Sequence, residues 1–347
     1  MRINVFDKEF VRIGILTTYV SLIWNEDYQN YDSFILHARD ITENVKLLKN
    51  GNFLVPDGKE TAGVITEVVI DSTDKTIMAM GYTTGYLLDQ RIVAVTNNTV
   101  NAESGMRNIV SNNIRGFNDI SVAPSKGYAD TFEIQHTYTE VPVALNEIAV
   151  GSGLGWKMRF DHRNKKHVFE VYKGVDRRQT QNVNTQAVFS DELRNLNNIV
   201  IDDDITLFKN YAYVAGAGEG VDRKIVEVGT AVGRDRHEMF VDARDLQPEE
   251  NETENSFDYE ERLKNRGISK LNERIQRQSF EIYIDYLDFG TRYNLGDYIS
   301  CRSRKYNVTL SVRIQKYTDV VENNTKITSL TLGTPRLDVI GYDRLVK

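Results

Sequence analysis

The sequence of 347 residues contains little cysteine, little proline and no long apolar run, and each shortage excludes a class of protein. Cys301 is the only cysteine, which rules out an internal disulfide and a cysteine-based zinc site. Charges interrupt the first residues, MRINVFDKEFVRIGIL, so the apolar core of a signal peptide is missing, and no stretch of about 18 apolar residues follows. We therefore expect a soluble protein that folds in a cytoplasm.

The residues that are plentiful favour strands. Tyrosine (18) and phenylalanine (14) are common whereas proline (5) is scarce, and aromatic side chains suit the half-buried surface of a sheet. Apolar residues make up 40% and charged residues 27%, as in a globular protein, and the length allows two or three domains. The net charge of −7 disfavours a protein that reads nucleic acid, although it fits a protein through which DNA passes without sticking.

The first hundred residues read as short strands joined by polar turns. Apolar alternation predicts strands within residues 9–39, and residues 41–48 predict a short helix. A turn at 50–51 precedes a strand at 53–55, and a hairpin follows over 64–80. This part of the chain predicts a small all-β unit.

The last hundred residues repeat these elements in the same order. Residues 279–282 correspond to 33–36 at an offset of 246, 295–299 to 50–54 at 245, 312–316 to 64–68 at 248, and Gly333 to Gly81 at 252. Offsets that drift by a few residues are what loop insertions produce. Any two antiparallel meanders share a coarse likeness, but four elements in one order favour a duplicated small barrel.

The segment between the two copies has a different pattern. Residues 99–115 and 142–150 predict helices, the second with Pro142 in its first turn, and residues 155–161 and 167–173 predict a hairpin. These elements indicate a mixed α+β region.

A second helix-forming region precedes the last copy. Residues 248–256 are acidic and read as a solvated linker, after which Asn255 or Ser256 can cap a helix over 257–276. Gly267 interrupts that helix at a cost of about 1 kcal/mol relative to alanine. Its apolar stripe consists of Tyr259, Leu263, Ile268, Leu271 and Ile275.

The expected fold class is therefore α+β and β-dominated, with two similar small β-barrels and helical or α+β segments between them. The expected domains are a first barrel (1–98), a middle domain (99–197), a second barrel (198–232 with 278–336), an acidic loop plus helix (233–277) and a C-terminal tail (337–347).

Two short motifs are candidate ligand sites, and each has a simpler interpretation. Gly216, Gly218 and Gly220 resemble a phosphate loop, but the strand pattern after them, in place of a helix N-terminus, indicates a hairpin turn. The run 202–204 (DDD) lacks the alternating ligands and glycine of a calcium loop, so it reads as a turn or the start of a strand.

The sequence supports no catalytic site, cofactor site or metal site. The histidines do not form a metal-binding pair, and we expect His162 and His167 at the surface and His37 packed in a strand; the five are His37, His136, His162, His167 and His237. Ser152 lies in GSGL, which is not a nucleophile elbow. The short basic patches at 177–178 and 302–305 read as solvated surface or subunit contacts.

Four groups of residues, in this order and spacing, resemble a known family. They are 21–24 with 34–36 and 50–55; 63–81 followed by 85–93; 213–223 with 234–238 and 241–244; and 293–297 with the hairpin that ends at Gly333. Together they are similar to the tail-associated hub proteins of siphophages and related prophages, which share the fold of the trimeric baseplate hub of contractile phages.

The resemblance implies a non-enzymatic structural protein of the phage tail tip. It implies a homotrimeric ring of six barrels in the virion, which contacts the distal tail or tube protein and the tip or tape-measure proteins, encloses a DNA channel without specific DNA binding, and touches no membrane. Many relatives carry a wall-degrading domain after the hub, whereas only 14 residues follow Gly333 here. The alternatives are a tail-associated wall hydrolase or peptidase, and a carbohydrate-binding receptor module that uses tyrosines such as Tyr28 and Tyr31.

Overall fold

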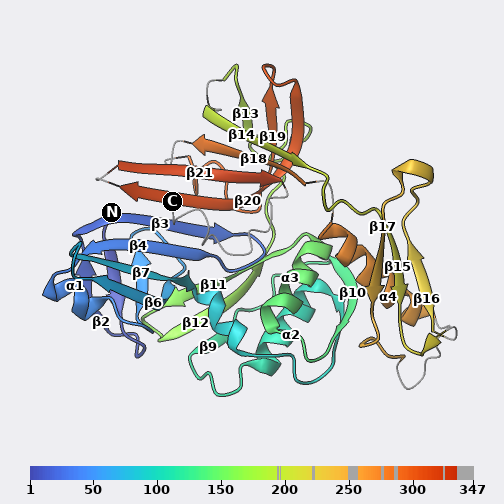
Figure 1. The fold of residues 1–347 in the computed structure, drawn as a ribbon, viewed down its shortest axis with the longest axis horizontal. Coiled ribbons are helices and arrows are strands. Elements are labelled where there is room, and N and C mark those ends of the chain that lie inside the picture. The colour runs from blue at the N-terminus through green and yellow to red at the C-terminus, as the bar shows by residue number, and fades with distance from the viewer. Residues whose placement is uncertain are drawn as a thin grey trace.

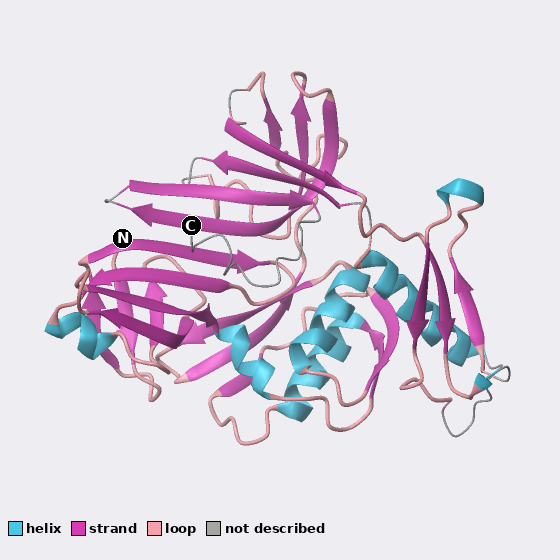
Figure 2. Ribbon diagram, viewed as in Figure 1, coloured by secondary structure: helices cyan, strands magenta, loops and turns pink. Residues whose placement is uncertain are grey.

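The computed structural model describes residues 1–193, 195, 197–220, 223–248, 257–274, 277–284, 288–322 and 325–333. Strands dominate these residues, and the longer helices lie in the central and distal parts of the chain (Figures 1 and 2). The largest sheet contains 13 strands and unites the two ends of the sequence. The prediction of a β-dominated α+β fold is confirmed.

The N-terminal part of this sheet forms because apolar residues alternate along its strands. In strand β4 every second residue from Phe34 to Ala38 is buried, and the Phe34 ring stacks on Trp24 of β3 at 5.4 Å between centroids. The elements of this part are β1 (Ile3–Phe6), β2 (Arg12–Leu16), β3 (Tyr19–Asp27), β4 (Ser33–Arg39), the predicted short helix α1 (Thr42–Leu47), β5 (Phe53–Pro56), β6 (Gly63–Asp71) and β7 (Thr76–Thr83).

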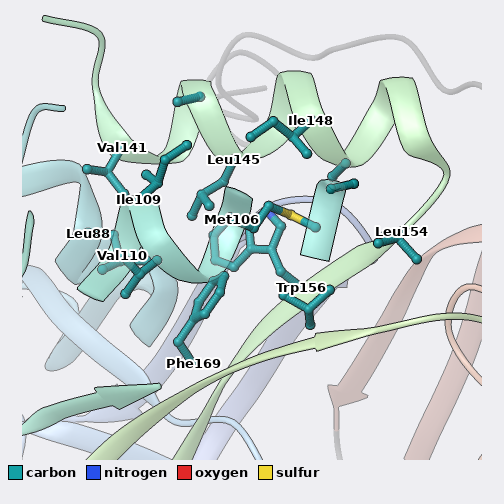
Figure 3. Packing of buried hydrophobic residues seen from close by; sticks show 14 of the residues in the cluster. Leu88, Met106, Ile109, Val110, Val141, Leu145, Ile148, Leu154, Trp156 and Phe169 are labelled. Atoms are coloured by element: carbon teal, nitrogen blue, oxygen red, sulfur yellow. The ribbon is translucent and has the colours of Figure 1, made fainter. Parts of the chain in front are cut away.

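The middle of the chain packs two helices on a small sheet (Figure 3). Met106 of the first helix, Leu145 of the second and Trp156 of the sheet are each almost fully buried in one apolar cluster. The elements are the 3-10 helix η1 (Thr84–Gln90), β8 (Asn97–Asn101), α2 (Ala102–Asn113), β9 (Ile120–Val122), β10 (Thr131–His136), α3 (Val141–Ser152), β11 (Gly155–Asp161) and β12 (Lys166–Tyr172). Both predicted helices and the predicted hairpin are present.

A three-stranded sheet with one helix lies beside the middle region (Figure 1). Its elements are β15 (Tyr211–Ala215), β16 (Ile225–Val228), the 3-10 helix η3 (Gly233–Asp235), β17 (Glu238–Asp242) and α4 (Phe257–Asn272). Tyr259 and Leu263 are buried as predicted, but Ile268 is 39% exposed, and Ile275 and the proposed caps lie outside the described residues. Gly267 allows close packing, since a Cβ atom there would lie 2.6 Å from Val214 Cγ2.

The last strands of the chain complete the large sheet. Its C-terminal part consists of β13 (Val188–Ser190), β14 (Asn197–Asp204), β18 (Arg277–Ile284), β19 (Tyr298–Ser303), β20 (Val308–Glu322) and β21 (Thr325–Gly333). We call β3, β4, β5, β6 and β7 the N-terminal sheet unit, and β14, β18, β19, β20 and β21 the C-terminal sheet unit.

The two sheet units have the same strand order. The N-terminal unit pairs β3-β4-β7-β6-β5, and the C-terminal unit pairs β14-β18-β21-β20-β19. Both also carry a bulge at the same point. Ile65 and Glu67 pair with Gly81 and Met80, and Ile314 and Lys316 pair with Leu332 and Thr331. A shared bulge is a specific local feature, so the duplication extends to the register.

The ladders refine two of the offsets proposed from sequence. The offsets of 246 for β18 and 245 for β19 agree with the strand pairing. The other two were wrong by one residue, because Ile314 corresponds to Ile65 at 249 and Leu332, rather than Gly333, corresponds to Gly81 at 251. Apolar alternation alone fixes a strand's face but fixes its exact register weakly.

The turns that lead into β5 and β19 are identical in their backbone hydrogen bonds. Gly51 N–H donates to Ile65 O at 2.8 Å, and Gly296 N–H donates to Ile314 O at 2.8 Å. The φ angles of the two glycines are 87° and 90°, in the left-handed region that glycine adopts without strain.

The described ladders do not close either sheet unit into a barrel. The path instead runs without interruption from β14 through β20, across to β3, and on through β6, β5 and β1 to β2. The expectation of two separate closed barrels is therefore not shown, because the two units share one continuous sheet through the β20–β3 ladder.

Candidate functional site: the joint between the sheet units

The N-terminal and C-terminal sheet units meet where strand β20 pairs with strand β3. The antiparallel ladder runs from Lys316 opposite Asp27 to Glu322 opposite Ser21. Thr318 Oγ1 donates a hydrogen bond of 2.8 Å to Asn25 Oδ1 across the ladder. We call this ladder the joint. It is the place where one copy of the duplicated unit binds the next.

The bulge residue Gln315 fixes the end of the joint. Its carbonyl accepts the Tyr28 N–H at 2.9 Å, and its side-chain amide donates to Gln29 Oε1 at 3.1 Å. Gln29 in turn donates to Ala149 O at 2.8 Å, at the end of helix α3. The bulge therefore connects both sheet units to the middle region.

A buried carboxylate lies within the joint. Asp319 is fully buried, and its Oδ1 accepts hydrogen bonds of 2.7 Å from Tyr317 and from Thr328. Its Oδ2 lies 3.3 Å from Lys59 Nζ and 3.1 Å from Lys326 Nζ. Burial raises the pKa of this carboxyl, but Lys59, the two hydroxyl donors and Lys326 outweigh burial and leave the pKa below its usual value. Asp319 is therefore an ionised, paired group.

Lys59 carries the link from this carboxylate to the N-terminal sheet unit. Its Nζ lies 3.0 Å from Glu26 and stands 3.9 Å from the centre of the Tyr317 ring. Neither Asp319 nor Lys59 was among the candidate residues predicted from the sequence. The signal was present, because Tyr317, Asp319 and Val321 alternate on one face of a strand, where an isolated carboxylate between apolar residues indicates a buried, paired charge.

A small polar pocket opens beside the joint. Glu26, Asp27, Thr61 and Trp156 are among the residues that line it. Burial raises the pKa of Asp27 to about 6, although Lys316 opposes the rise. Thr61 Oγ1 and Trp156 Nε1 are buried and have no hydrogen-bond partner within the described part of the chain.

The comparisons with known proteins agree with this architecture. The family model described as Siphovirus ReqiPepy6 Gp37-like protein matches residues 2–334. The chain belongs to this family. No curated protein matches the chain.

Three solved structures show the fold of this Gp37-like chain at low sequence identity. The tail protein from Neisseria meningitidis MC58 is 12% identical with a TM-score of 0.62, and 95% of each chain is covered. The 43 kDa tail protein of prophage MuSo2 from Shewanella oneidensis is 11% identical with a TM-score of 0.60, covering 96% of this chain and 99% of that one. Prophage tail protein gp18 from Listeria monocytogenes EGD-e is 13% identical with a TM-score of 0.53, covering 95% and 94%. The Gp37-like chain therefore has the fold of these phage and prophage tail proteins.

The glycine and aspartate motifs of the Gp37-like chain are structural. Residues 216–220 lie between the antiparallel strands β15 and β16, which confirms the interpretation as a hairpin turn. Residues 202–204 are the last three of strand β14 and pair with β18, so the expectation of a turn or the start of a strand was wrong. Within the described ranges, no group of three or more His, Cys, Asp or Glu side chains has a metal-binding arrangement.

One of the histidine predictions was wrong. His167 is fully buried among Phe10, Phe53 and Phe160, at ring-centroid distances of 4.9–5.5 Å. Burial lowers its pKa to about 3, so the ring is neutral. The lysine-rich turn suggested exposure, but the inward face of β12 begins at this residue. His162 is exposed and His37 is half-buried in β4, as predicted.

The remaining candidates make structural contacts. Ser152 Oγ donates to Ile148 O at 2.7 Å at the end of α3, and Gly153 ends that helix in the left-handed conformation. Arg177 pairs with the buried Asp297 at 2.6 Å and Arg178 pairs with Asp176 at 2.6 Å, whereas Arg304 contacts Glu192. His136 is buried and lies 2.9 Å from Glu147.

Tyr28, which suggested a carbohydrate-binding surface, is fully buried, and Tyr31 is partly buried. No helix among the described residues is long and apolar enough to span a membrane.

Proposed function

We propose that this chain is a structural hub of a phage or prophage tail tip. Three copies form a ring that joins the distal tail or tube protein to the tip or tape-measure proteins, and DNA passes through the lumen. The family match and the tail-protein fold support a tail protein. The placement at the tip, the ring and the virion location are our inference.

The observation that carries the proposal is the duplicated sheet unit. Two units with one strand order and one bulge allow a threefold assembly to present six equivalent faces. A chain with a single unit needs six copies to achieve the same match to a sixfold tube. The net charge of −7 suits a lumen that does not retain DNA.

The proposal includes the division of the chain into functional parts. The two sheet units supply the ring. The middle region with helices α2 and α3, and the separate sheet of β15, β16 and β17 with helix α4, supply the outer contacts. Among the described strands of the expected second-barrel segment 198–232, only β14 lies in a sheet unit, because β15 and β16 pair with each other and β15 pairs with β17. Neither catalysis nor a cofactor is part of this function.

Light scattering during size exclusion, with and without the tube protein, tests the proposal. The expected mass is three times the chain mass of 39.8 kDa. A monomer in both conditions contradicts the proposal.

The pocket beside the joint favours one alternative, a wall hydrolase. That hypothesis requires a concave site with a carboxyl of raised pKa, and Asp27 meets this description. However, Asp27 Oδ1 accepts the Gln29 N–H at 2.8 Å and Oδ2 lies 3.8 Å from Lys316, so structural contacts already engage both oxygens. Release of fragments from purified cell walls, lost in Asp27→Asn, would support the hydrolase; equal inactivity of both proteins would contradict it.

A further inference from the structure

Two strands of the duplicated sheet, β6 and β14, have an edge without a pairing partner among the described ladders, and these two edges correspond to the two edges that meet in the joint. In the joint, the far half of β20 pairs with β3. The far half of β6 corresponds to this half of β20, and β14 corresponds to β3. Within the described ladders, residues Val68–Asp71 of β6 pair only with β7, and β14 pairs only with β18.

The joint therefore has a second, unfilled version, made by β14 at one end of the path and by the half of β6 that does not pair with β5. Read along the sheet, the order is β14-β18-β21-β20 followed by β3-β4-β7-β6. The same four-strand block occurs twice, head to tail, with one contact between the blocks. A head-to-tail contact that repeats builds a closed ring or an open filament, because each copy always offers the surface that the next one needs.

We propose that β14 of one protomer pairs with the free edge of β6 in a second copy of this chain, in the register of the joint. This proposal rests on the proposed trimer and specifies its interface. The register follows from the joint, in which Thr318 faces Asn25. The equivalent residues are Val69 of β6 and position 202 of β14, so Val69 faces position 202 and Ile70 faces position 201 of the neighbour.

The exposed side chains of these strands fit an interface. Val69 is 43% exposed and Ile70 is 50% exposed on β6, and Val200 on β14 is 55% exposed. Apolar β-branched residues on an open sheet edge promote pairing with another chain, and natural proteins blunt such edges unless they are used. Three chains joined in this way form a ring of six blocks in which the β14 edge and the free edge of β6 are both filled.

A pair of cysteines tests the register. Residues that face each other in an antiparallel ladder have Cα atoms about 4.5–5.5 Å apart, within the range of a disulfide. We expect Val69→Cys with Asp202→Cys in one chain to form bonds between chains, giving covalent dimers and closed trimers on a non-reducing gel. The matched control is Asn25→Cys with Thr318→Cys, the same pair within the joint, which forms a bond inside one chain and runs as a monomer. The native Cys301 is buried and stays in both variants.

The possible outcomes distinguish failure of the proposed β14–β6 interface from failure of the proposed trimer. One outcome is a trimer by light scattering in which Val69→Cys/Asp202→Cys fails to link chains while the control pair forms its disulfide. That result contradicts the proposed β14–β6 ladder but leaves the trimeric hub intact. A bond within one chain for the Val69 and Asp202 pair also overturns it. A protein that is monomeric at every concentration and with the tube protein contradicts both proposals.

A charge on the free edge gives a second test without cysteines. Ile70→Lys is expected to raise the concentration needed for half-assembly about tenfold or more, which corresponds to about 1.4 kcal/mol. At concentrations where both proteins are monomeric, its melting temperature should match that of the parent, because the side chain is half exposed in the protomer. Val232→Lys, at a residue that is 75% exposed and away from the edge, is the matched control and should change neither quantity. Equal assembly of the two variants contradicts the interface.

Discussion

The ring of Tyr28 packs directly against Gly296, so that a Cβ atom on this glycine would lie 2.1 Å from Tyr28 Cε2. The Tyr28 hydroxyl accepts the Gly174 N–H at 3.1 Å, and the Arg313 guanidinium lies 4.9 Å from the centre of its ring. One tyrosine after strand β3 thus holds the C-terminal sheet unit and the middle region together. Gly51 occupies the same turn in the N-terminal sheet unit, and no described atom lies within 4 Å of a Cβ atom there.

This difference predicts unequal effects of the same substitution at two equivalent turns. Gly51→Ala places alanine at positive φ and should cost about 1–2 kcal/mol of unfolding free energy. Gly296→Ala carries the same strain and adds overpacking against Tyr28, about 1–3 kcal/mol more. Urea denaturation of both variants measures the difference. Equal losses of stability would show that the Tyr28 contact contributes little.

The buried ion cluster around Asp319 predicts that the conservative substitution Asp319→Asn causes a large loss of unfolding free energy. Asp319→Asn removes the charge that Lys59 and Lys326 share, and breaking a buried pair on one side costs about 3–5 kcal/mol. Asp57→Asn is the matched control. Asp57 pairs with Arg2 at the surface, where such a pair contributes at most about 1 kcal/mol.

The midpoints and slopes of denaturant unfolding curves give the unfolding free energies of the two variants and test this prediction. If Asp319→Asn fails to fold, Lys59→Met tests the same cluster from the opposite side with Lys326 still in place. A stability for Asp319→Asn within 1 kcal/mol of the Asp57→Asn protein contradicts the role given to the cluster.

The raised pKa of Asp27 predicts that replacing this residue increases the free energy of unfolding by an amount that depends on pH. Its pKa in the folded chain is about 6, because burial outweighs the attraction of Lys316, whereas an unfolded aspartate titrates near about 3.9. A raised pKa in the fold means that ionisation costs stability. The cost is absent below about pH 4, grows between pH 4 and pH 6, and is complete above pH 6.

We therefore expect Asp27→Asn to be more stable than the parent at pH 7 by about 1–3 kcal/mol, and equally stable near pH 4. The Asn side chain can still accept the Gln29 N–H. Unfolding free energies measured from pH 4 to pH 8 provide the check, and a difference that does not vary with pH contradicts the explanation.

His167 predicts that the free energy of unfolding falls in acid, because its pKa is lowered in the fold whereas the pKa of Asp27 is raised. Burial among aromatic rings lowers its pKa in the folded chain to about 3, below the value of about 6.5 in an unfolded chain. The contribution of His167 is therefore complete above pH 6.5 and is lost as the pH falls from 6.5 towards 3, by up to about 1.4 kcal/mol per pH unit. Asp119, at 4.0 Å from the ring, is the carboxylate that faces it.

Replacing the His167 ring should reduce the fall in unfolding free energy between about pH 6.5 and about pH 3, which we call the acid limb of the stability curve. His167→Phe keeps the aromatic packing with Phe10, Phe53 and Phe160 and removes the proton. His162→Phe, on the exposed side of the same turn, is the control and should leave the acid limb unchanged. Parallel curves for the His167→Phe variant and the parent would contradict the assignment.

The strand order of the sheet units followed from the sequence because local signals determine it. The turn at Asn50-Gly51 and its copy at Leu295-Gly296 stand before strands with apolar alternation, and both the glycines and the alternation survive in the two copies. The offsets at these points were correct. The register of β20 and β21 was wrong by one residue, because apolar alternation shows which face of a strand is buried but specifies the exact register only weakly.

The joint itself did not follow from the sequence. The β20–β3 ladder joins residues almost 300 positions apart, and such long-range pairing leaves no periodic signal in either strand. A barrel closed within each copy satisfies the same alternation as a sheet that continues from one copy into the next. His167 was misplaced for a related reason, because its burial depends on Phe10 and Phe53 from the distant N-terminal strands.

Electron cryo-microscopy of the assembled protein, or of the tail that contains it, tests the central claim most directly. The account predicts a threefold ring in which six four-strand blocks repeat, with β14 beside β6 of the neighbour at the spacing that β3 and β20 have inside each chain. A ring in which β6 and β14 face solvent, or an assembly without threefold symmetry, would contradict it.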